Sequence, residues 1–282
     1  MASDTSTLRI ALIQMTSTED RAENLSRAEQ LIRKAAGQGA QLVATPENFA
    51  ELRSSPGPPT FSEPLDGQIV TRFGRIARDH AVWLLLGSIP EESEEPPKIH
   101  NTSVLLRPDG TIAAVYRKIH LFDVEIPGQV ELRESDSVLP GDELTQIGTP
   151  WGSVGLTICY DLRFPELFRA LALGGARLIL VPSAFTAFTG AAHWETLLRA
   201  RAIENQCYVA APAQTGRHSP SRASHGHSMI VDPWGGIVAV KPEGEGVLMA
   251  TLEMSHVDEV RRRIPSLQQA RRWLQSALPK VQ

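Results

Sequence analysis

A cysteine at position 159 ends an apolar segment and begins a turn. Residues 155–158 have the pattern of a buried strand, and residues 164–167 have the pattern of a helix start. Unpaired N–H groups at the first turn of such a helix favour a thiolate, which is the nucleophilic form of cysteine. The sequence therefore predicts that Cys159 is a nucleophile held toward its thiolate form. The alternative is a small buried hydrophobic residue, which is how free cysteine commonly behaves.

Two charged residues can complete such a site. Glu47 follows a buried apolar segment, residues 42–44, and Lys118 stands at the end of another strand-like segment. A thiol that attacks a carbonyl carbon needs a base for its proton and a partner for the oxyanion. A glutamate can supply the first and a lysine the second. Either residue alone could be solvated, and spacing does not show that the side chains meet, although ligand sites cluster at strand carboxyl ends.

Strand-like and helix-like segments alternate along the chain, which predicts an α/β protein with mixed sheets. Apolar stripes predict helices ending at 37–39, covering 69–80 and running from about 191 to 205. The turn sequence Pro108-Asp109-Gly110 predicts a hairpin. The strand-like segments are 8–15, 42–44, 82–87, 102–106, 111–116, 155–159, 178–181, 208–211, 229–231, 237–240 and 247–252. Pro-, Ser- and Glu-rich stretches at 53–64 and 91–98 are expected to be surface loops, so we expect one domain, residues 1–282.

Composition argues against several classes of function. The 282 residues carry a net charge of −4 with both signs mixed, so no binding of nucleic acid is expected. No apolar run approaches the roughly 18 residues that span a bilayer, and residues 1–7 lack the features of a secretory signal. The two cysteines, Cys159 and Cys207, are far apart in sequence, so we expect free thiols, a cytoplasmic location and no membrane partner.

Three segments of the chain resemble motifs of the nitrilase, or carbon–nitrogen hydrolase, superfamily. They are Pro46-Glu47, residues 117–128 (RKIHLFDVEIPG) and residues 159–166 (CYDLRFPE). The third motif continues into residues 182–185, 193–194 and 199–204. Motifs of this length in this order are highly specific. The resemblance implies a nitrilase fold, in which a single α/β domain forms a four-layer αββα sandwich of two mixed sheets.

The same resemblance implies catalytic roles. Glu47, Lys118 and Cys159 would form a Glu–Lys–Cys triad, and Glu134 would be a second glutamate that shapes the site. Cysteine would form a thioester acyl-enzyme, with the oxyanion held between Lys118 and a backbone N–H, that of Tyr160. No metal and no cofactor are implied.

Residues 225–229 (HGHSM) and 231–235 (VDPWG) resemble the Nit branch of amidases within this superfamily. In that branch, residues matching Arg163, Phe185 and Thr189 line the substrate pocket, which implies a small amide that bears a carboxylate. The structural alternative for Arg163 is a salt bridge within its own motif. The implied substrate is deaminated glutathione, cleaved to 2-oxoglutarate and Cys-Gly. The alternatives are an ω-amidase acting on α-ketoglutaramate or succinamate, a nitrilase and an N-carbamoyl-amine hydrolase.

The resemblance also implies a homodimer or homotetramer, and we expect residues 265–282 to lie at a subunit interface. Two further interpretations stay open. In a papain-like hydrolase, Cys159 would pair with a histidine, and the candidates are His193, His218, His225 and His227. In a non-enzymatic class, the chain would be a nitrilase-fold interaction scaffold, although it retains all three triad residues.

Overall fold

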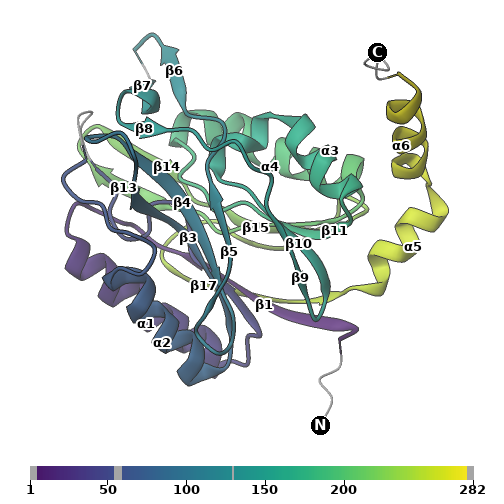
Figure 1. Cartoon of the computed structure of the whole chain (residues 1–282), viewed down its shortest axis with the longest axis horizontal. Helices are drawn as coiled ribbons and strands as arrows, with labels where there is room; N and C mark the ends of the chain where they lie inside the picture. Colours follow the sequence, from purple (N-terminus) through teal and green to yellow (C-terminus); the bar gives the residue numbers. More distant parts are fainter. Residues whose placement is uncertain (1–4, 54–58, 129, 278–282) are drawn as a thin grey trace.

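The first strand, β1 (Thr7–Gln14), shows how the layers stack. Leu8, Ile10 and Leu12 join one apolar cluster, whereas Ala11 and Ile13 join another. Because successive side chains of a strand point to opposite faces, the sheet that contains β1 is covered on both faces. The computed structural model, which describes residues 5–53, 59–128 and 130–277, places two helices against one face and a second sheet against the other (Figure 1).

The first sheet is mixed and has the strand order β17-β1-β2-β3-β4-β5, with β8 beside β4. Strands β1, β2 and β3 are parallel, and their neighbours β17 and β4 run antiparallel to them. The other members of this sheet are β2 (Leu42–Ala44), β3 (Trp83–Glu92), β4 (Ile99–Leu106), β5 (Ile112–Arg117), β8 (Val138–Leu139) and β17 (Gly246–Glu253). Helices α1 (Arg21–Gly37) and α2 (Gln68–His80) cover its outer face through buried residues such as Ile32 and Phe73.

The second sheet is also mixed and has the order β16-β15-β12-β11-β10-β9. Its strands are β9 (Gln146–Thr149), β10 (Gly152–Leu156), β11 (Ala176–Leu180), β12 (Tyr208–Ala211), β15 (Ser228–Val231) and β16 (Ile237–Lys241). Its outer face carries α3 (Pro165–Leu173) and α4 (Ala187–Asn205), which follow the 3₁₀ helix η2 (Cys159–Arg163). Leu156 and Leu180 share one core cluster with Leu12 of β1, so the two sheets pack face to face. The predicted four-layer αββα sandwich is confirmed.

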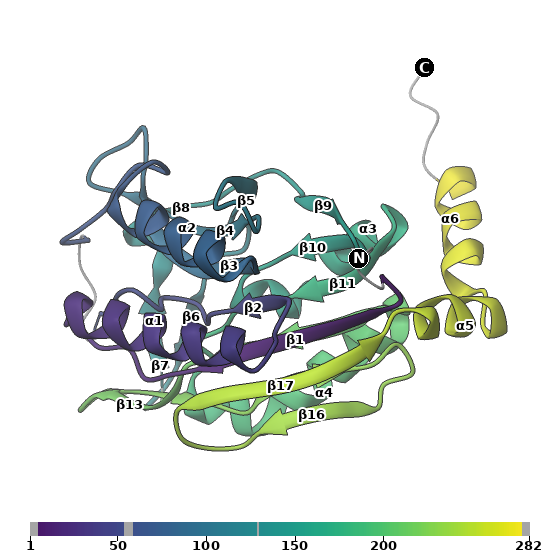
Figure 2. The same ribbon diagram turned by 90° about the horizontal axis from the view of Figure 1, so that it is seen from below.

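Smaller elements lie around the sandwich. They are the hairpins β6 (Asp123–Ile126) with β7 (Val130–Arg133) and β13 (Thr215–Ser219) with β14 (Arg222–His225), the 3₁₀ helix η1 (Glu134–Asp136), α5 (Ser255–Arg263) and α6 (Ser266–Ala277). Helix α6 follows α5 at one end of the sandwich in Figure 2, and its Arg271 side chain donates to the carbonyl of Leu173 at the end of α3. The last part of the predicted interface tail, residues 278–282, lies outside the described residues. No helix within the described ranges combines the length and the hydropathy that crossing a bilayer requires.

Several predicted boundaries are wrong. The strand expected over 155–159 is β10, which ends at Leu156, because the chain turns into the 3₁₀ helix η2 at Cys159. Strand β3 continues past Gly87 to Glu92, because a register shift between Leu86 and Ile89 lets it resume pairing with β4. Gly87 lies against the chain before Glu47: a Cβ there would come within 2.1 Å of the Thr45 carbonyl oxygen. Helix α4 begins at Ala187, four residues before the predicted start, because the hydroxyl of Thr186 accepts a hydrogen bond from the N–H of Thr189 and caps the first turn.

Candidate active site

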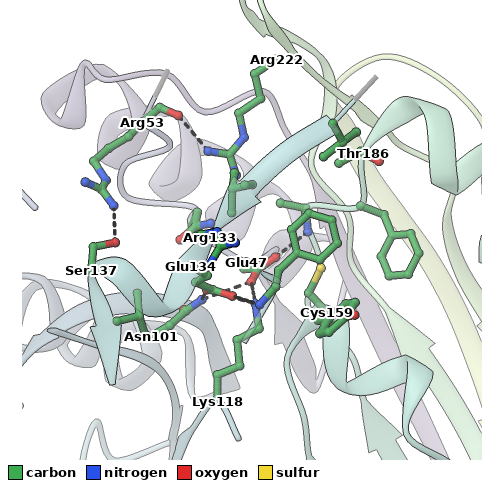
Figure 3. Close-up of a pocket in the computed structure, with 18 of the residues that line it drawn as sticks. Glu47, Arg53, Asn101, Lys118, Arg133, Glu134, Ser137, Cys159, Thr186 and Arg222 are labelled. Carbon is green, nitrogen blue, oxygen red and sulfur yellow. Dashed lines mark hydrogen bonds and ion pairs between the residues drawn. The ribbon is translucent and has the colours of Figure 1, made fainter. Parts of the chain in front are cut away.

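The sequence-predicted Glu47, Lys118 and Cys159 lie just beyond the carboxyl ends of β2, β5 and β10, and they converge (Figure 3). Lys118 Nζ donates to Glu47 Oε1 at 2.9 Å and to Glu134 Oε2 at 2.8 Å. All three residues are buried: Lys118 is 2 % exposed, Glu47 3 % and Cys159 7 %. The charges of Glu47 and Lys118 both act on the Cys159 thiol. Four residues from distant parts of the chain thus form one buried polar cluster.

The cluster keeps Lys118 charged although it is buried. Burial alone would lower the pKa of Lys118, but the carboxylates of Glu134 and Glu47 outweigh that effect and hold it well above its ordinary value. The two carboxylates therefore stabilise an ammonium group beside the thiol. Such an ammonium can stabilise negative charge that develops on a substrate oxygen.

Cys159 differs from the sequence-based expectation. Burial raises the pKa of its thiol well above the ordinary value, the Glu47 carboxylate raises it further, and the opposing charge of Lys118 does not cancel these effects. The α-helix that was expected to favour a thiolate begins only at Pro165, after the short 3₁₀ helix that starts at Cys159 itself. Burial thus outweighs the helix effect that was expected to favour the thiolate, and the arrangement requires a base. Glu47 is the carboxylate in position to act as one.

The backbone presents the thiol on a sharp turn. Cys159 has a φ of 47°, a conformation that residues other than glycine rarely adopt. Its N–H donates to the carbonyl of Pro182 at 3.0 Å. Asp161, which is fully buried, accepts the N–H of Ile158 at 2.8 Å and the hydroxyl of Tyr116 at 2.7 Å. These bonds fix the residues on both sides of Cys159.

Two further contacts were missed by the sequence analysis. Asn101 on β4 donates from Nδ2 to Glu47 Oε1 and to Glu134 Oε1, each at 3.1 Å, and so ties the two glutamates together. The N–H of Ala184 donates to Glu47 Oε2 at 2.8 Å. The available signal for Asn101 was weak, because it is one of four consecutive polar residues, 100–103, at the start of β4. A backbone contact such as that of Ala184 leaves no signal in the sequence.

The cluster opens into a cavity of about 590 Å³, which Tyr160, Arg163, Phe185 and Thr189 also line. The Arg163 guanidinium carbon lies 5.1 Å from the centre of the Phe185 ring and 5.7 Å from that of Tyr160. Its Nη1 lies 3.2 Å from Nδ1 of His193. Among the described residues no acidic side chain pairs with Arg163, so the alternative of a salt bridge within the motif has no support.

The N–H of Tyr160 is the backbone donor that was expected to hold the oxyanion. No acceptor for this N–H is found in the part of the chain that the structure describes. Its ring packs edge-on against Phe122 and Phe164, with ring centres 5.0 and 5.4 Å apart. The backbone at Tyr160 is thus fixed beside the thiol while its donor stays available.

The histidines named for a papain-like site are engaged elsewhere. His218 contacts the carbonyl of Ser17 and the hydroxyl of Ser224, each at 2.8 Å. His225 and His227 stack on each other with ring centres 4.1 Å apart. Within the described ranges, no group of three or more His, Cys, Asp or Glu side chains is arranged to hold a metal ion. The group that faces the thiol is a carboxylate, not an imidazole.

Comparison with known proteins identifies the family. The family model described as carbon-nitrogen hydrolase matches residues 9–262. The chain is 47 % identical over 267 residues to deaminated glutathione amidase of Homo sapiens, covering 93 % of this chain and 82 % of that protein. It is 40 % identical over 266 residues to omega-amidase NIT2 of Mus musculus, covering 94 % of this chain and 96 % of that protein.

Solved structures agree with this assignment. The NitFhit protein of C. elegans is 41 % identical with a TM-score of 0.85 over 93 % of this chain, which spans only 65 % of that chain's length. A mutant of the amidase from Nesterenkonia sp. AN1 is 28 % identical with a TM-score of 0.74, covering 97 % of this chain and 99 % of that one. That structure shows covalent addition of the acetamide moiety of fluoroacetamide at the active-site cysteine. From these matches, the chain belongs to the carbon-nitrogen hydrolase family and is a hydrolase that acts on C–N bonds.

Proposed function

We propose that the chain is an amidase that hydrolyses deaminated glutathione to 2-oxoglutarate and Cys-Gly through a thioester at Cys159. The observation that carries this proposal is the Lys118 ammonium, bound by Glu47 and Glu134 at 2.9 and 2.8 Å beside the buried thiol. The 47 % identity to deaminated glutathione amidase supports the substrate. A base, an oxyanion partner and a nucleophile are what acyl transfer requires.

In the first half of the reaction, Glu47 removes the proton from the Cys159 thiol and the sulfur attacks the amide carbon. The amide oxygen becomes an oxyanion, which Lys118 and the N–H of Tyr160 stabilise. Glu47 then gives the proton to the amine nitrogen as the C–N bond breaks, and the acyl group remains on sulfur as a thioester. The Ala184 N–H and Asn101 hold the Glu47 carboxylate in place for both proton transfers.

In the second half, Glu47 takes a proton from water, whose oxygen attacks the thioester carbon. The C–S bond breaks, the carboxylic acid product leaves, and the sulfur regains its proton. Because the pKa of Cys159 is raised, the thiol is the stable resting form, and each turnover restores it.

The acyl half of the substrate carries an α-keto carboxylate, and Arg163 is the group that we assign to it. Its guanidinium lies over Phe185 and has no acidic partner among the described residues, so it can pair with a substrate carboxylate. Thr189, whose side chain is buried in the first turn of α4, completes this side of the cavity.

An ω-amidase is the second candidate, because the relative NIT2 is 40 % identical over nearly the whole chain. It would use the same groups on α-ketoglutaramate and release ammonia. A cytoplasmic location and a homodimer or homotetramer, with the C-terminal helix at the interface, stay parts of the proposal. Light scattering on the eluted protein would test the oligomer, because a monomer mass contradicts it.

The test is a substrate panel of deaminated glutathione, α-ketoglutaramate, succinamate, a nitrile and an N-carbamoyl amine, with a Cys159→Ala variant as the control. We expect deaminated glutathione to have the highest kcat/KM, and acid-quenched enzyme to carry an acyl group on the peptide that contains Cys159. A higher kcat/KM for α-ketoglutaramate would indicate the ω-amidase. No turnover and no acylation with any member would indicate an interaction scaffold.

A further inference from the structure

The cavity has a second cationic end that the proposed chemistry has not used. Arg222, the first residue of β14, lines the same cavity as Arg163 and Lys118. In Figure 3 its side chain extends from the hairpin toward the cluster of Glu47 and Glu134. Lys118 pairs with both glutamates and is assigned to the oxyanion, and Arg163 is assigned to the carboxylate of the acyl half, so Arg222 is a cation without a role in that scheme.

Among the described residues, no acidic side chain is hydrogen-bonded to Arg222. Its Nη1 donates to the carbonyl of Arg53 at 2.8 Å, which is its one hydrogen bond among the described residues. Other arginines of the chain pair with carboxylates, namely Arg21, Arg72, Arg117, Arg177 and Arg201. Burial lowers the pKa of Arg222 from its ordinary value, which reflects the cost of holding its charge away from water. A partly buried guanidinium with unused donors is suited to a planar anion.

The surroundings of Arg222 offer no competing anion within bonding distance among the described residues. Glu47, Glu134 and Cys159 are close enough for their charges to act on the guanidinium, but none of them is hydrogen-bonded to it. The neighbouring His218 is kept neutral, since burial lowers its pKa to about 4 and both ring nitrogens have partners. The cavity therefore presents the Arg222 guanidinium in addition to the Lys118 ammonium beside the catalytic carboxylates, and the charge of Arg53 also acts on Arg222.

The position of Arg222 indicates which half of a substrate it meets. Glu47 returns its proton to the departing amine, so the amine leaves on the Glu47 side. Arg222 lies within electrostatic reach of Glu47 and Glu134, whereas Arg163 lies over Phe185 on α4's side of the cavity. A cavity of about 590 Å³ has room for a substrate that extends both ways from the reacting carbon.

We propose that Arg222 binds a carboxylate on the departing amine and so selects amides with an anionic leaving group over primary amides. This inference rests on the proposed function: Cys-Gly carries such a carboxylate, and the ammonia released from α-ketoglutaramate does not. Both substrates have the same acyl half, so Arg163 serves both equally. Arg222 then determines the specificity between them.

The experiment compares kcat/KM for deaminated glutathione and α-ketoglutaramate in the wild type, in Arg222→Met and in Arg217→Met. Arg217 is the matched control, because it lies on the same hairpin, is exposed and bonds only to the Pro220 carbonyl among the described residues. We expect the ratio of the two kcat/KM values to fall about 10- to 100-fold in Arg222→Met, as for the loss of a charge-assisted hydrogen bond, and to stay constant in Arg217→Met.

A second arm changes the substrate and leaves the protein intact, in case the variant fails to fold. With the wild-type enzyme, kcat/KM should fall by a similar factor when the glycine carboxylate of deaminated glutathione is converted to an amide. The role of Arg222 would be overturned if Arg222→Met lowered kcat/KM equally for both substrates, or if the wild type showed no lower kcat/KM for the amidated substrate. Either outcome would leave the proposed amidase intact. If the wild type hydrolyses neither parent substrate, the proposed function fails, and the inference fails with it.

Discussion

Lys118 and Glu134 meet in a forked contact, in which the ammonium nitrogen lies 3.1 Å from one carboxylate oxygen and 2.8 Å from the other. The second oxygen also accepts the N–H of Phe122 at 2.7 Å, so the carboxylate is fixed. Of the charges around Lys118, that of Glu134 contributes most to keeping the amine protonated. Glu134 thus keeps the Lys118 amine protonated, although Glu134 itself has no proposed contact with the substrate.

Replacing Glu134 with Gln should lower kcat/KM about 10- to 150-fold, the loss expected for a charge-assisted hydrogen bond of about 1.5–3 kcal/mol. Without this carboxylate, burial dominates and the pKa of Lys118 falls. The alkaline limb of the pH profile of kcat/KM should therefore move to lower pH. Glu125→Gln, at an exposed position on β6, is the control. An unmoved alkaline limb would contradict this account of Lys118.

Replacing Glu47 with Gln should make the Cys159 thiol easier to ionise and should nevertheless slow amide hydrolysis. The Glu47 carboxylate raises the pKa of the thiol, so its removal should let Cys159 ionise at lower pH. Turnover should nevertheless fall by at least about 10²-fold, because the general base is lost. The pH dependence of alkylation by iodoacetamide measures the first effect and amide hydrolysis the second. If the thiol titrated at higher pH in this variant, the Glu47 carboxylate could not be what raises the pKa of Cys159.

Asp161→Ala should destabilise the fold. The substitution leaves the buried N–H of Ile158 and the buried hydroxyl of Tyr116 without their acceptor, at about 1–3 kcal/mol each. Urea unfolding measures the loss, and Asp142→Ala, at an exposed position, is the matched control. Because Ile158 precedes the nucleophile, the rate of Cys159 acylation should fall as well. Equal unfolding free energies for the two variants would contradict the role of Asp161.

His218 should make stability depend on pH below neutrality. Burial lowers its pKa from 6.5 to about 4, so the unfolded chain takes up a proton before the folded protein does. The contribution of the neutral imidazole is complete above pH 6.5 and is lost as the pH falls toward 4. His218→Asn, which keeps a donor toward the Ser17 carbonyl, should flatten the decline in unfolding free energy over this range. A decline as steep as that of the wild type would refute the prediction.

The order of the elements and the two-sheet sandwich could be predicted, because apolar periodicity and long motifs carry that information. The start of α4 was missed because the capping hydroxyl of Thr186 lies before any apolar stripe. The end of β3 was missed because the strand resumes after a bulge beside Gly87, where the sequence indicates a stop.

The site residues could be named from motifs, but the state of the thiol could not. Glu47 and Lys118 are 71 positions apart, and only the folded chain sets how close their charges come to Cys159. The motifs predicted a helix after Cys159. Whether the dipole of that helix outweighs the effect of burial on the pKa of the thiol depends on how many residues separate Cys159 from the helix start. Arg222 was overlooked for a related reason: surface and buried arginines look alike in a sequence.

The raised pKa of Cys159 also affects how fast oxidants inactivate the protein. Peroxide and disulfide oxidants attack the thiolate, and a protonated, buried sulfur reacts with them slowly. In the proposed mechanism the sulfur ionises only when Glu47 removes its proton, so it would be protected from oxidation between turnovers.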